Sequence, residues 1–403
     1  MLGQLLVLGL SWTPLAVCFL TTEPLDSKLV FDPAFYVNTH ADLHGLRTTN
    51  EARKHWLSTG IKEGRQGCGS FHSVQYLKRY SDLSKAFGTD YRQAIEHYLT
   101  NGYSKEGRLG IVEGGDEGRW TISSHHHDLF LSASKRTGGA VDSLVWDHKE
   151  FLNSWDHGRE MQMAMNTHPW GECFNPTEAG GRDDAIHDTT KSTVLHVRAH
   201  QNTMETANYP AFWLRPGTKQ TRPGHGPCGH DKPALNKNTV YKHQFSKTVT
   251  IGCAGLDNCI KFVSNFTLGG HWPDGYTGIN LESPACYMTS DFNVLLNYDL
   301  TTRKAHTFNS NRRPTVLATS DGRHAMGLYA PSGQDSDEFQ YYDAKSFGTN
   351  FASGTNKLNV VFRKNPFPDG TTKHMVYTSY ACVGSRNVVT SCLDAVHKAY
   401  PSV

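Results

Sequence analysis

Residues 149–181 read KEFLNSWDHGREMQMAMNTHPWGECFNPTEAGG, and the rest of the chain is organised around this segment. Glycine pairs frame it, at 138–139 and at 180–181. Six of its titratable residues stand among tryptophan, methionine and phenylalanine: Asp156, His157, Arg159, Glu160, Glu172 and Glu178. Charged groups among aromatic residues at turns are typical of a sugar-binding or acid/base site. No complete catalytic signature is present.

The charge of the chain is nearly balanced. Its 403 residues include 40 basic and 38 acidic side chains, for a formal net charge of +2. This balance gives no excess of positive charge that would attract nucleic acid or an anionic membrane surface, so we expect neither as a partner. Glycine and aromatic residues are plentiful, a composition typical of a β-rich globular protein with many turns.

The N-terminus has the features of an export signal. Residues 2–19 are apolar, but polar residues and Pro14 interrupt them, so the run is too short and broken for a membrane span. Ala16, Val17 and Cys18 are small residues at a cleavage position. We therefore predict a signal peptide over 1–18 and no membrane span in the mature protein.

Removal of this signal leaves eight cysteines, and an even number in an exported chain favours disulfides over free thiols. They are Cys68, Cys173, Cys228, Cys253, Cys259, Cys286, Cys382 and Cys392. The simplest local pairs are Cys253 with Cys259 and Cys382 with Cys392, and the remaining connectivity stays open. Asn265 begins the glycosylation sequon Asn-Phe-Thr, which is used only in a secretory pathway. We expect a secreted, extracellular glycoprotein.

Residues 31–70 and 71–108 carry the same pattern twice. Each unit has early aromatic residues, then Asp-Leu, a His-aromatic pair, a glycine and Glu-Gly-Arg. The helical spacing in the second unit predicts a small two-unit helical module over 25–110. The pattern resembles short repeats of secreted and cell-surface proteins, a likeness that implies no activity. His55 and His97 hold equivalent positions, which favours packing beside aromatic neighbours over metal binding.

The following segment, 111–119, is Gly-rich and acidic and predicts a linker. Beyond it, short β-branched and aromatic runs alternate with Pro, Gly and Asn/Asp clusters, without regular helix–strand alternation. The sequence therefore predicts a mainly β fold. We expect a large antiparallel β-sandwich over 120–403, preceded by the small N-terminal helical repeat module.

Five stretches carry a resemblance to a known fold family. Residues 138–146, 151–153 and 156–162 are similar to the "GG.I..L.W…F.N..D.GR..Q" strand pair that opens galactose-mutarotase-like β-supersandwich proteins. Residues 172–180 resemble the motif that follows, and 282–287 resemble a later acidic strand. The likeness implies a supersandwich over about 120–400 and a carbohydrate context, without fixing a reaction.

The epimerase branch of that superfamily pairs a histidine acid with a carboxylate base beside the anomeric carbon of a sugar. The resemblance implies His157 and His196 as candidate acids. The candidate bases are Glu172, Glu178 and Glu282. A base must lie within hydrogen-bond reach of the proton it takes. Arg159 is suited to hold a sugar carboxylate through two parallel hydrogen bonds. A full epimerase set does not match this chain.

Polysaccharide lyases on related sandwiches use a Tyr or His base beside a uronic carboxylate that Arg or Asn neutralises. The chain supplies these residue types as His157, Arg159, Asn175 and Tyr287. The alternative is structural, with Asp156 and Arg159 as a buried ion pair and with Glu172 and Glu178 bonded to loop amides. Because charged networks also form without any chemistry, we favour the structural alternative over catalysis.

A sugar site also needs aromatic faces and amide groups, for which Trp155, Trp170 and Asn175 are the candidates. We expect no metal and no cofactor. Residues 225–230 place His and Cys at short spacing, but in an exported chain Cys228 is better explained by a disulfide than by zinc.

The leading hypothesis is a secreted protein that recognises carbohydrate through its sandwich, with catalysis left open. Its partners would be glycans or components of the extracellular matrix. One alternative is a non-enzymatic matrix component, for example of a mineralised or glycan-rich layer. A second alternative is a polysaccharide lyase or a sugar epimerase.

Overall fold

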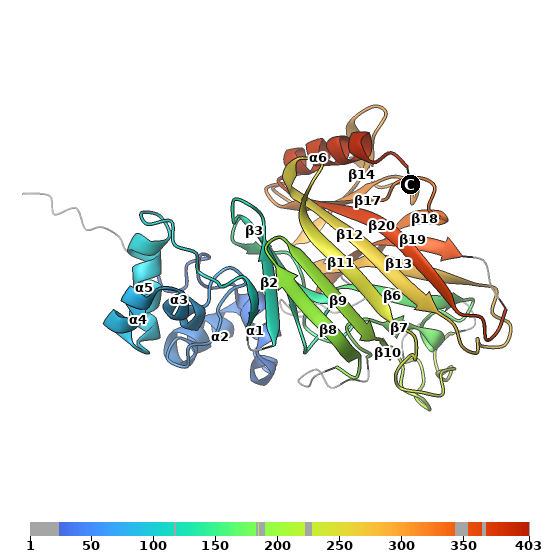
Figure 1. Cartoon of the computed structure of the whole chain (residues 1–403), viewed down its shortest axis with the longest axis horizontal. Coiled ribbons are helices and arrows are strands. Elements are labelled where there is room, and N and C mark those ends of the chain that lie inside the picture. Colours follow the sequence, from blue (N-terminus) through green and yellow to red (C-terminus); the bar gives the residue numbers. More distant parts are fainter. Residues whose placement is uncertain are drawn as a thin grey trace, which may run out of the picture.

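The chain forms a group of short helices followed by two large antiparallel sheets, with one helix near its C-terminal end (Figure 1). The computed structural model describes residues 24–116, 118–182, 184, 190–221, 228–342, 354–364 and 368–402. The predicted signal peptide over 1–18 lies outside them. The fold is mainly β, as the sequence predicts: a large sandwich with a small N-terminal helical module. No helix in the described ranges is both long and apolar enough to cross a membrane.

The N-terminal module consists of single-turn and two-turn helices. They are α1 (Pro33–Thr39), η1 (Ala41–Leu43), α2 (Thr49–His55), η2 (Trp56–Gly60), α3 (Ser73–Arg79), α4 (Ser81–Phe87), α5 (Tyr91–His97) and η3 (Tyr98–Gly102). Polar caps start three of them, including α5, where the Asp90 side chain accepts from the amide of Gln93. The Asp32 carboxylate accepts from two amides of the first turn of α1, and Thr48 and Glu51 form a capping box on α2.

The two repeats share one buried contact. The hydroxyl of Tyr36 lies 2.9 Å from Nδ1 of His55, and the hydroxyl of Tyr76 lies 3.0 Å from Nδ1 of His97. Each histidine therefore packs against a buried tyrosine of its own unit, as expected for a structural role. In both units a glycine lies against the tyrosine hydroxyl and leaves no room for a side chain. A Cβ added to Gly60 would overlap the Tyr36 hydroxyl, and a Cβ added to Gly102 would overlap the Tyr76 hydroxyl.

The first sheet contains eleven of the described strands. They are β1 (Gly114–Asp116), β2 (Arg119–Ser123), β3 (Leu129–Ser134), β4 (Val141–Trp146), β5 (Lys149–Glu150), β6 (Met161–His168), β7 (Pro176–Thr177), β10 (Ala211–Phe212), β13 (Gly278–Thr289), β18 (Ser336–Tyr342) and β19 (Thr355–Lys364). The main path runs β1-β2-β3-β4-β6-β13-β19-β18.

Within the segment 111–119, whose composition predicts a linker, Gly114–Asp116 form the edge strand β1 of this sheet and Arg119 begins β2. Gly114 pairs with Thr121 as part of the edge strand β1, since backbone amides pair whatever the side chain. Ile111 is buried in a small cluster with Phe130 and Val145. The module is therefore joined to the sandwich by a packed segment.

The second sheet contains nine of the described strands. They are β8 (Thr193–His200), β9 (Thr203–Tyr209), β11 (Phe245–Cys253), β12 (Leu256–Leu268), β14 (Phe292–Asp299), β15 (Lys304–Thr307), β16 (Thr315–Thr319), β17 (Ala325–Tyr329) and β20 (Lys373–Gly384). The order is β15-β14-β16-β17-β20-β12-β11-β9-β8. Apolar side chains from both sheets fill one shared core, and helix α6 (Arg386–Ala399) packs on β17 and β20.

Three disulfides form among the described residues. They join Cys173 to Cys228, Cys253 to Cys259 and Cys382 to Cys392, and the last two are the local pairs expected from the spacing. The even count does not make every cysteine a disulfide, because Cys68 and Cys286 are free thiols buried in apolar surroundings. Their separation between the helical module and the first sheet explains why they do not pair.

The module packs directly on the sandwich. The ring of Trp155 stacks on His44 of the module at 4.6 Å, and the Arg119 guanidinium lies over the ring of Phe35 at 5.6 Å. Trp155 belongs to the hydrophobic core of the module and is only 8% exposed. This tryptophan therefore joins the two parts of the chain and presents no open face to a sugar.

Candidate functional site

The charged residues of the stretch 156–160 point into the protein. Arg159 is 5% exposed and its Nε lies 2.7 Å from the Asp156 carboxylate, while His157 is 1% exposed. This is the buried ion pair of the structural alternative. Because His157 and Arg159 are almost fully buried, they have no route to a sugar substrate, although the Asp156 side chain is 22% exposed.

Glu178 lies deep between the two sheets. Its carboxylate forms an ion pair with Lys247 of β11 and accepts hydrogen bonds from the amide of Met163 and the hydroxyl of Thr206, at 2.8 and 3.3 Å. Both Glu178 and Lys247 are buried, and this burial lowers the pKa of Lys247. Glu178 therefore stabilises the core, where no substrate can reach it.

Glu282 lies elsewhere, on the outer side of the first sheet. Its Oε2 is 2.6 Å from Nζ of Lys357, a residue that the sequence analysis did not single out. Along β19 the odd-numbered side chains share this outer side with Lys357, while Leu358, Val360 and Phe362 enter the core. Ten polar side chains of β6, β13, β18 and β19 form what we call the polar face: Asn166, Asn280, Glu282, Tyr287, Glu338, Gln340, Tyr342, Lys357, Asn359 and Arg363.

A row of three side chains crosses the middle of the polar face. Lys357 stands directly opposite Tyr287 on one side and Tyr342 on the other in the strand register. Its Nζ lies 5.1 Å from the ring centre of Tyr287 and 5.3 Å from that of Tyr342. Ammonium groups at this distance from aromatic rings are attracted by the ring quadrupole.

Electrostatic interactions within this row determine the protonation states of its members. Burial alone would lower the pKa of Lys357, but the Glu282 carboxylate and the two phenols outweigh burial and raise it. Burial likewise raises the pKa of Tyr287 to about 12, although Lys357 opposes the shift. At neutral pH the lysine is therefore a cation and Tyr287 a neutral hydroxyl, so Tyr287 can donate to a ligand but cannot serve as a base.

A hydrogen-bonded network continues the polar face toward the ends of β6 and β13. Asn280 donates to Asn166 at 3.0 Å and accepts from Arg363 at 2.8 Å. The same guanidinium donates to Glu338 at 2.7 Å, and this bond lowers the pKa of Glu338 even though burial opposes it. Each cation of the polar face thus has a carboxylate partner.

Asn359 stands next to Lys357 on the same side of β19. Its side chain is 0% exposed, and neither its amide nitrogen nor its carbonyl oxygen has a hydrogen-bond partner among the described residues. A buried amide without partners costs free energy. Because Asn359 is fully buried, a ligand on the polar face reaches Tyr342, the exposed member of the row, and not this amide.

The other predicted residues lie at separate places. Glu172 is exposed at the start of η4 (Glu172–Phe174). Burial is the main cause that raises the pKa of Tyr342, and the charge of Glu172 adds to this shift, so Glu172 lies within electrostatic range of Tyr342. Asn175 is half-buried, and Trp170 lines a cavity at the end of the sandwich. Of the five predicted acid/base residues, only Glu282 belongs to the polar face, and Glu172 lies near it.

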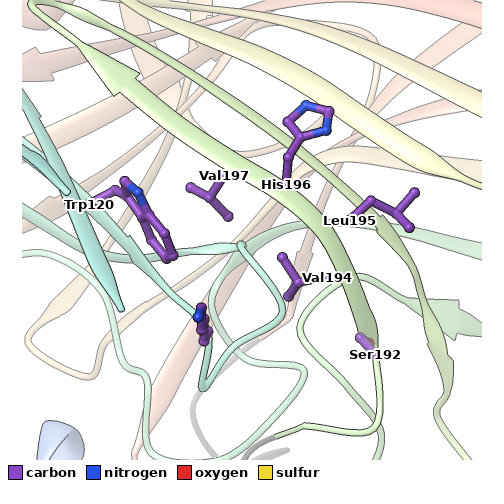
Figure 2. A pocket seen from close by; sticks show the side chains of 7 residues that line it. Trp120, Ser192, Val194, Leu195, His196 and Val197 are labelled. Atoms are coloured by element: carbon purple, nitrogen blue, oxygen red, sulfur yellow. The ribbon is translucent and has the colours of Figure 1, made fainter. Parts of the chain in front are cut away.

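His196 lines a different hollow, of about 510 Å³, beside the edge strand β8 (Figure 2). Trp120 and Val197 line the same hollow, and none of its residues belongs to the polar face. Asn265 is half-buried on β12, opposite Val376 of β20, and its glycosylation stays a prediction. Part of the predicted 225–230 segment lies outside the described residues, and Cys228 is in a disulfide.

Sequence reasoning missed Lys357, Asn359, Tyr342 and Arg363. The signal that locates two of them is the segment NKLNVVFRK over 356–364, where Lys357 and Asn359 alternate with apolar residues. Alternation of this kind indicates a strand with one polar side. The polar side chains of neighbouring strands become one face only once the strand order is known.

No family model matches the sequence, and comparison with curated proteins finds no match. Among solved structures, similar ones include a mutant of heparan sulfate lyase HepC from Pedobacter heparinus, which is 9% identical with a TM-score of 0.39. That match covers 84% of this chain and 47% of the lyase, so the chain spans about half of the lyase's length.

Two further similar structures are a galactose mutarotase-like protein from Lactobacillus casei ATCC 334 and the alpha-N-acetylgalactosaminidase NagBb from Bifidobacterium bifidum. The first is 10% identical with a TM-score of 0.28, and the match covers 66% of this chain and 100% of that one. The second is 11% identical with a TM-score of 0.34, and the match covers 66% and 36%. We base the function below on the geometry of the site alone.

Proposed function

We propose that this chain is a secreted protein that binds carbohydrate on the polar face of its first sheet. The observation that carries the proposal is the row Tyr287–Lys357–Tyr342, in which Tyr342 is 36% exposed. Sugars offer hydroxyl groups that both donate and accept, together with flat C–H surfaces. The polar face offers amides, carboxylates and cations that can hydrogen-bond to the hydroxyl groups. Its tyrosine rings can stack on the C–H surfaces.

The geometry supports binding better than turnover. Tyr287 keeps its proton at neutral pH because its pKa is about 12, and the Glu282 carboxylate is bonded to Lys357 at 2.6 Å. An acid/base pair needs one group free to take a proton near the working pH. We therefore propose recognition without catalysis, with the partners being glycans of the extracellular space.

Secretion is part of the proposal. Three disulfides among the described residues fit an oxidising compartment, since such bonds are rare in reducing ones. The test is mass spectrometry of the secreted chain, which should show an N-terminus after Cys18 and glycan on Asn265. A retained Met1 together with reduced thiols at Cys253 and Cys382 would contradict secretion.

The binding test uses Tyr342, which is 36% exposed, so its removal leaves the core intact. Tyr342→Ala should weaken binding to the glycans that the wild-type chain retains on an array by about tenfold, because aromatic stacking and hydroxyl contacts are lost. The matched control is Tyr103→Ala, which removes a tyrosine of 42% exposure from the helical module and should leave binding unchanged.

Three outcomes are decisive. Wild-type chain that binds no glycan, or equal loss in both tyrosine variants, would contradict the proposal, and self-assembly without glycan would then favour the matrix alternative. Release of an unsaturated uronate or conversion of an aldose would favour the lyase or epimerase alternative. In that case Glu172→Gln, at an exposed residue near the two tyrosines, should abolish turnover while binding persists.

A further inference from the structure

A second cavity, of about 630 Å³, opens at the end of the sandwich where β6 and β12 finish. Its volume lies in the range of pockets that hold small molecules. Aromatic rings dominate its wall, among them Trp170, Phe174, Phe212, Tyr241 and Trp272. No residue of the polar face lines it, so it is a separate site.

Several polar atoms of this wall are already used within the protein. The Tyr241 hydroxyl donates to the carbonyl of Gly269 and accepts from its amide, both at 2.9 Å, and the Trp170 indole donates to the carbonyl of Asp274 at 3.0 Å. The Asn236 amide nitrogen likewise donates to backbone carbonyls. A ligand in this cavity therefore meets mainly apolar surface, which suits a sugar poorly because its hydroxyls would lose their hydrogen bonds with water.

Three exposed charged residues line the cavity besides His271: Lys237, Lys242 and Asp274. Neither lysine has a carboxylate within ion-pair distance among the described residues, and the two ammonium groups outnumber the one carboxylate of the lining. His271 also lies at the mouth, but its Nδ1 is 2.7 Å from the Asp369 carboxylate. The two lysines are therefore available to an anionic group held at the entrance.

We infer that this cavity binds a small amphipathic anion, with its apolar body among the aromatic rings and its carboxylate or sulfonate at Lys237 and Lys242. The apolar body gains free energy by leaving water, at about 25 cal/mol for each Å² buried. The anionic head stays at the entrance, where it keeps much of its hydration and interacts with two ammonium groups. A neutral ligand would use only the first interaction.

The test compares two fluorescent probes that share one ring system. 8-Anilinonaphthalene-1-sulfonate carries the anionic head, and N-phenyl-1-naphthylamine lacks it. The double variant Lys237→Gln/Lys242→Gln should weaken binding of the sulfonate probe to the folded full chain about tenfold and leave the neutral probe unchanged. Trp170→Ala should weaken both probes, because it removes wall surface that both contact.

The matched control is Lys219→Gln/Lys232→Gln, which neutralises two exposed lysines that do not line the cavity. It should leave both probes unaffected, and circular dichroism should show every variant folded. The inference is overturned if the wild-type chain binds neither probe, if both lysine pairs weaken the sulfonate probe equally, or if Lys237→Gln/Lys242→Gln weakens both probes alike. Because the polar face is not touched, glycan binding should survive in these variants.

Discussion

Replacing Glu160 by glutamine should flatten the pH dependence of the stability of the chain. The Glu160 side chain is 0% exposed, and neither carboxyl oxygen has a hydrogen-bond partner among the described residues. Burial raises its pKa to about 8 against the attraction of Arg136, and Asp156 and Asp142 add to the shift. The carboxyl group is therefore mostly protonated at neutral pH and becomes a buried charge above pH 8.

The sign and size of the effect follow from linkage between protonation and folding. The folded pKa of about 8 lies above the ordinary value of 4.5, so the folded chain holds one more proton between these values. The stability that this proton contributes is complete below the lower pKa and is lost as the pH rises through the upper one. One such group makes the free energy of unfolding fall by about 2 kcal/mol between pH 6 and pH 8.

The assay is urea unfolding at pH 6, 7 and 8, followed by tryptophan fluorescence. Glutamine has nearly the same shape as glutamic acid but does not titrate. The free energy of unfolding of Glu160→Gln should therefore fall by about 2 kcal/mol less between pH 6 and pH 8 than that of the wild type. Glu96→Gln, at an exposed glutamate of the module, is the control and should follow the wild type. Parallel pH curves for Glu160→Gln and the wild type would refute the reasoning.

Three further predictions concern contacts that hold the fold. Lys247→Met strands the buried Glu178 carboxylate and should cost about 3–5 kcal/mol in urea unfolding, most of which Glu178→Gln should restore in the double variant. Gly102→Ala should lower the melting temperature, because the added Cβ overlaps the Tyr76 hydroxyl. Gly107→Ala should lower it less, because the added Cβ meets open space and only the positive φ disfavours alanine there. Trp155→Ala should speed hydrogen exchange in the helical module with little change in β12, since it removes the stack that docks the module.

The architecture could be predicted because it follows from periodic patterns. Alternation over 242–249 corresponds to the start of β11, whose side chains alternate between the core and the outer side, and the repeated units each form their own buried Tyr–His contact. The edge strand β1 could not be predicted, because its glycines give no pattern and its pairing depends only on backbone amides.

The site was harder to predict, and Glu178 shows why. A glutamate next to glycines and aromatic residues has the same sequence context whether it faces a groove or a core. Only the position of Lys247, 69 residues further along the chain, decides that Glu178 is an internal ion pair. Glu282 has the same chemistry, but its lysine lies on β19 and the pair faces outward.

The stretch 149–181 therefore matters for the fold more than for binding. Several of its polar residues are bonded within the protein: Glu150 accepts from the amides of Leu144 and Leu152, and Gln162 donates to the carbonyl of Gly158 and accepts from the amide of Ala179. Groups committed in this way cannot be released to a ligand without the desolvation cost of a buried polar atom. A binding function has to use side chains whose removal leaves the core intact, and the partly exposed Tyr342 on the polar face meets that condition. Function in this chain is thus better sought around Tyr342, on the outer side of β13, β18 and β19, than in its most distinctive motif.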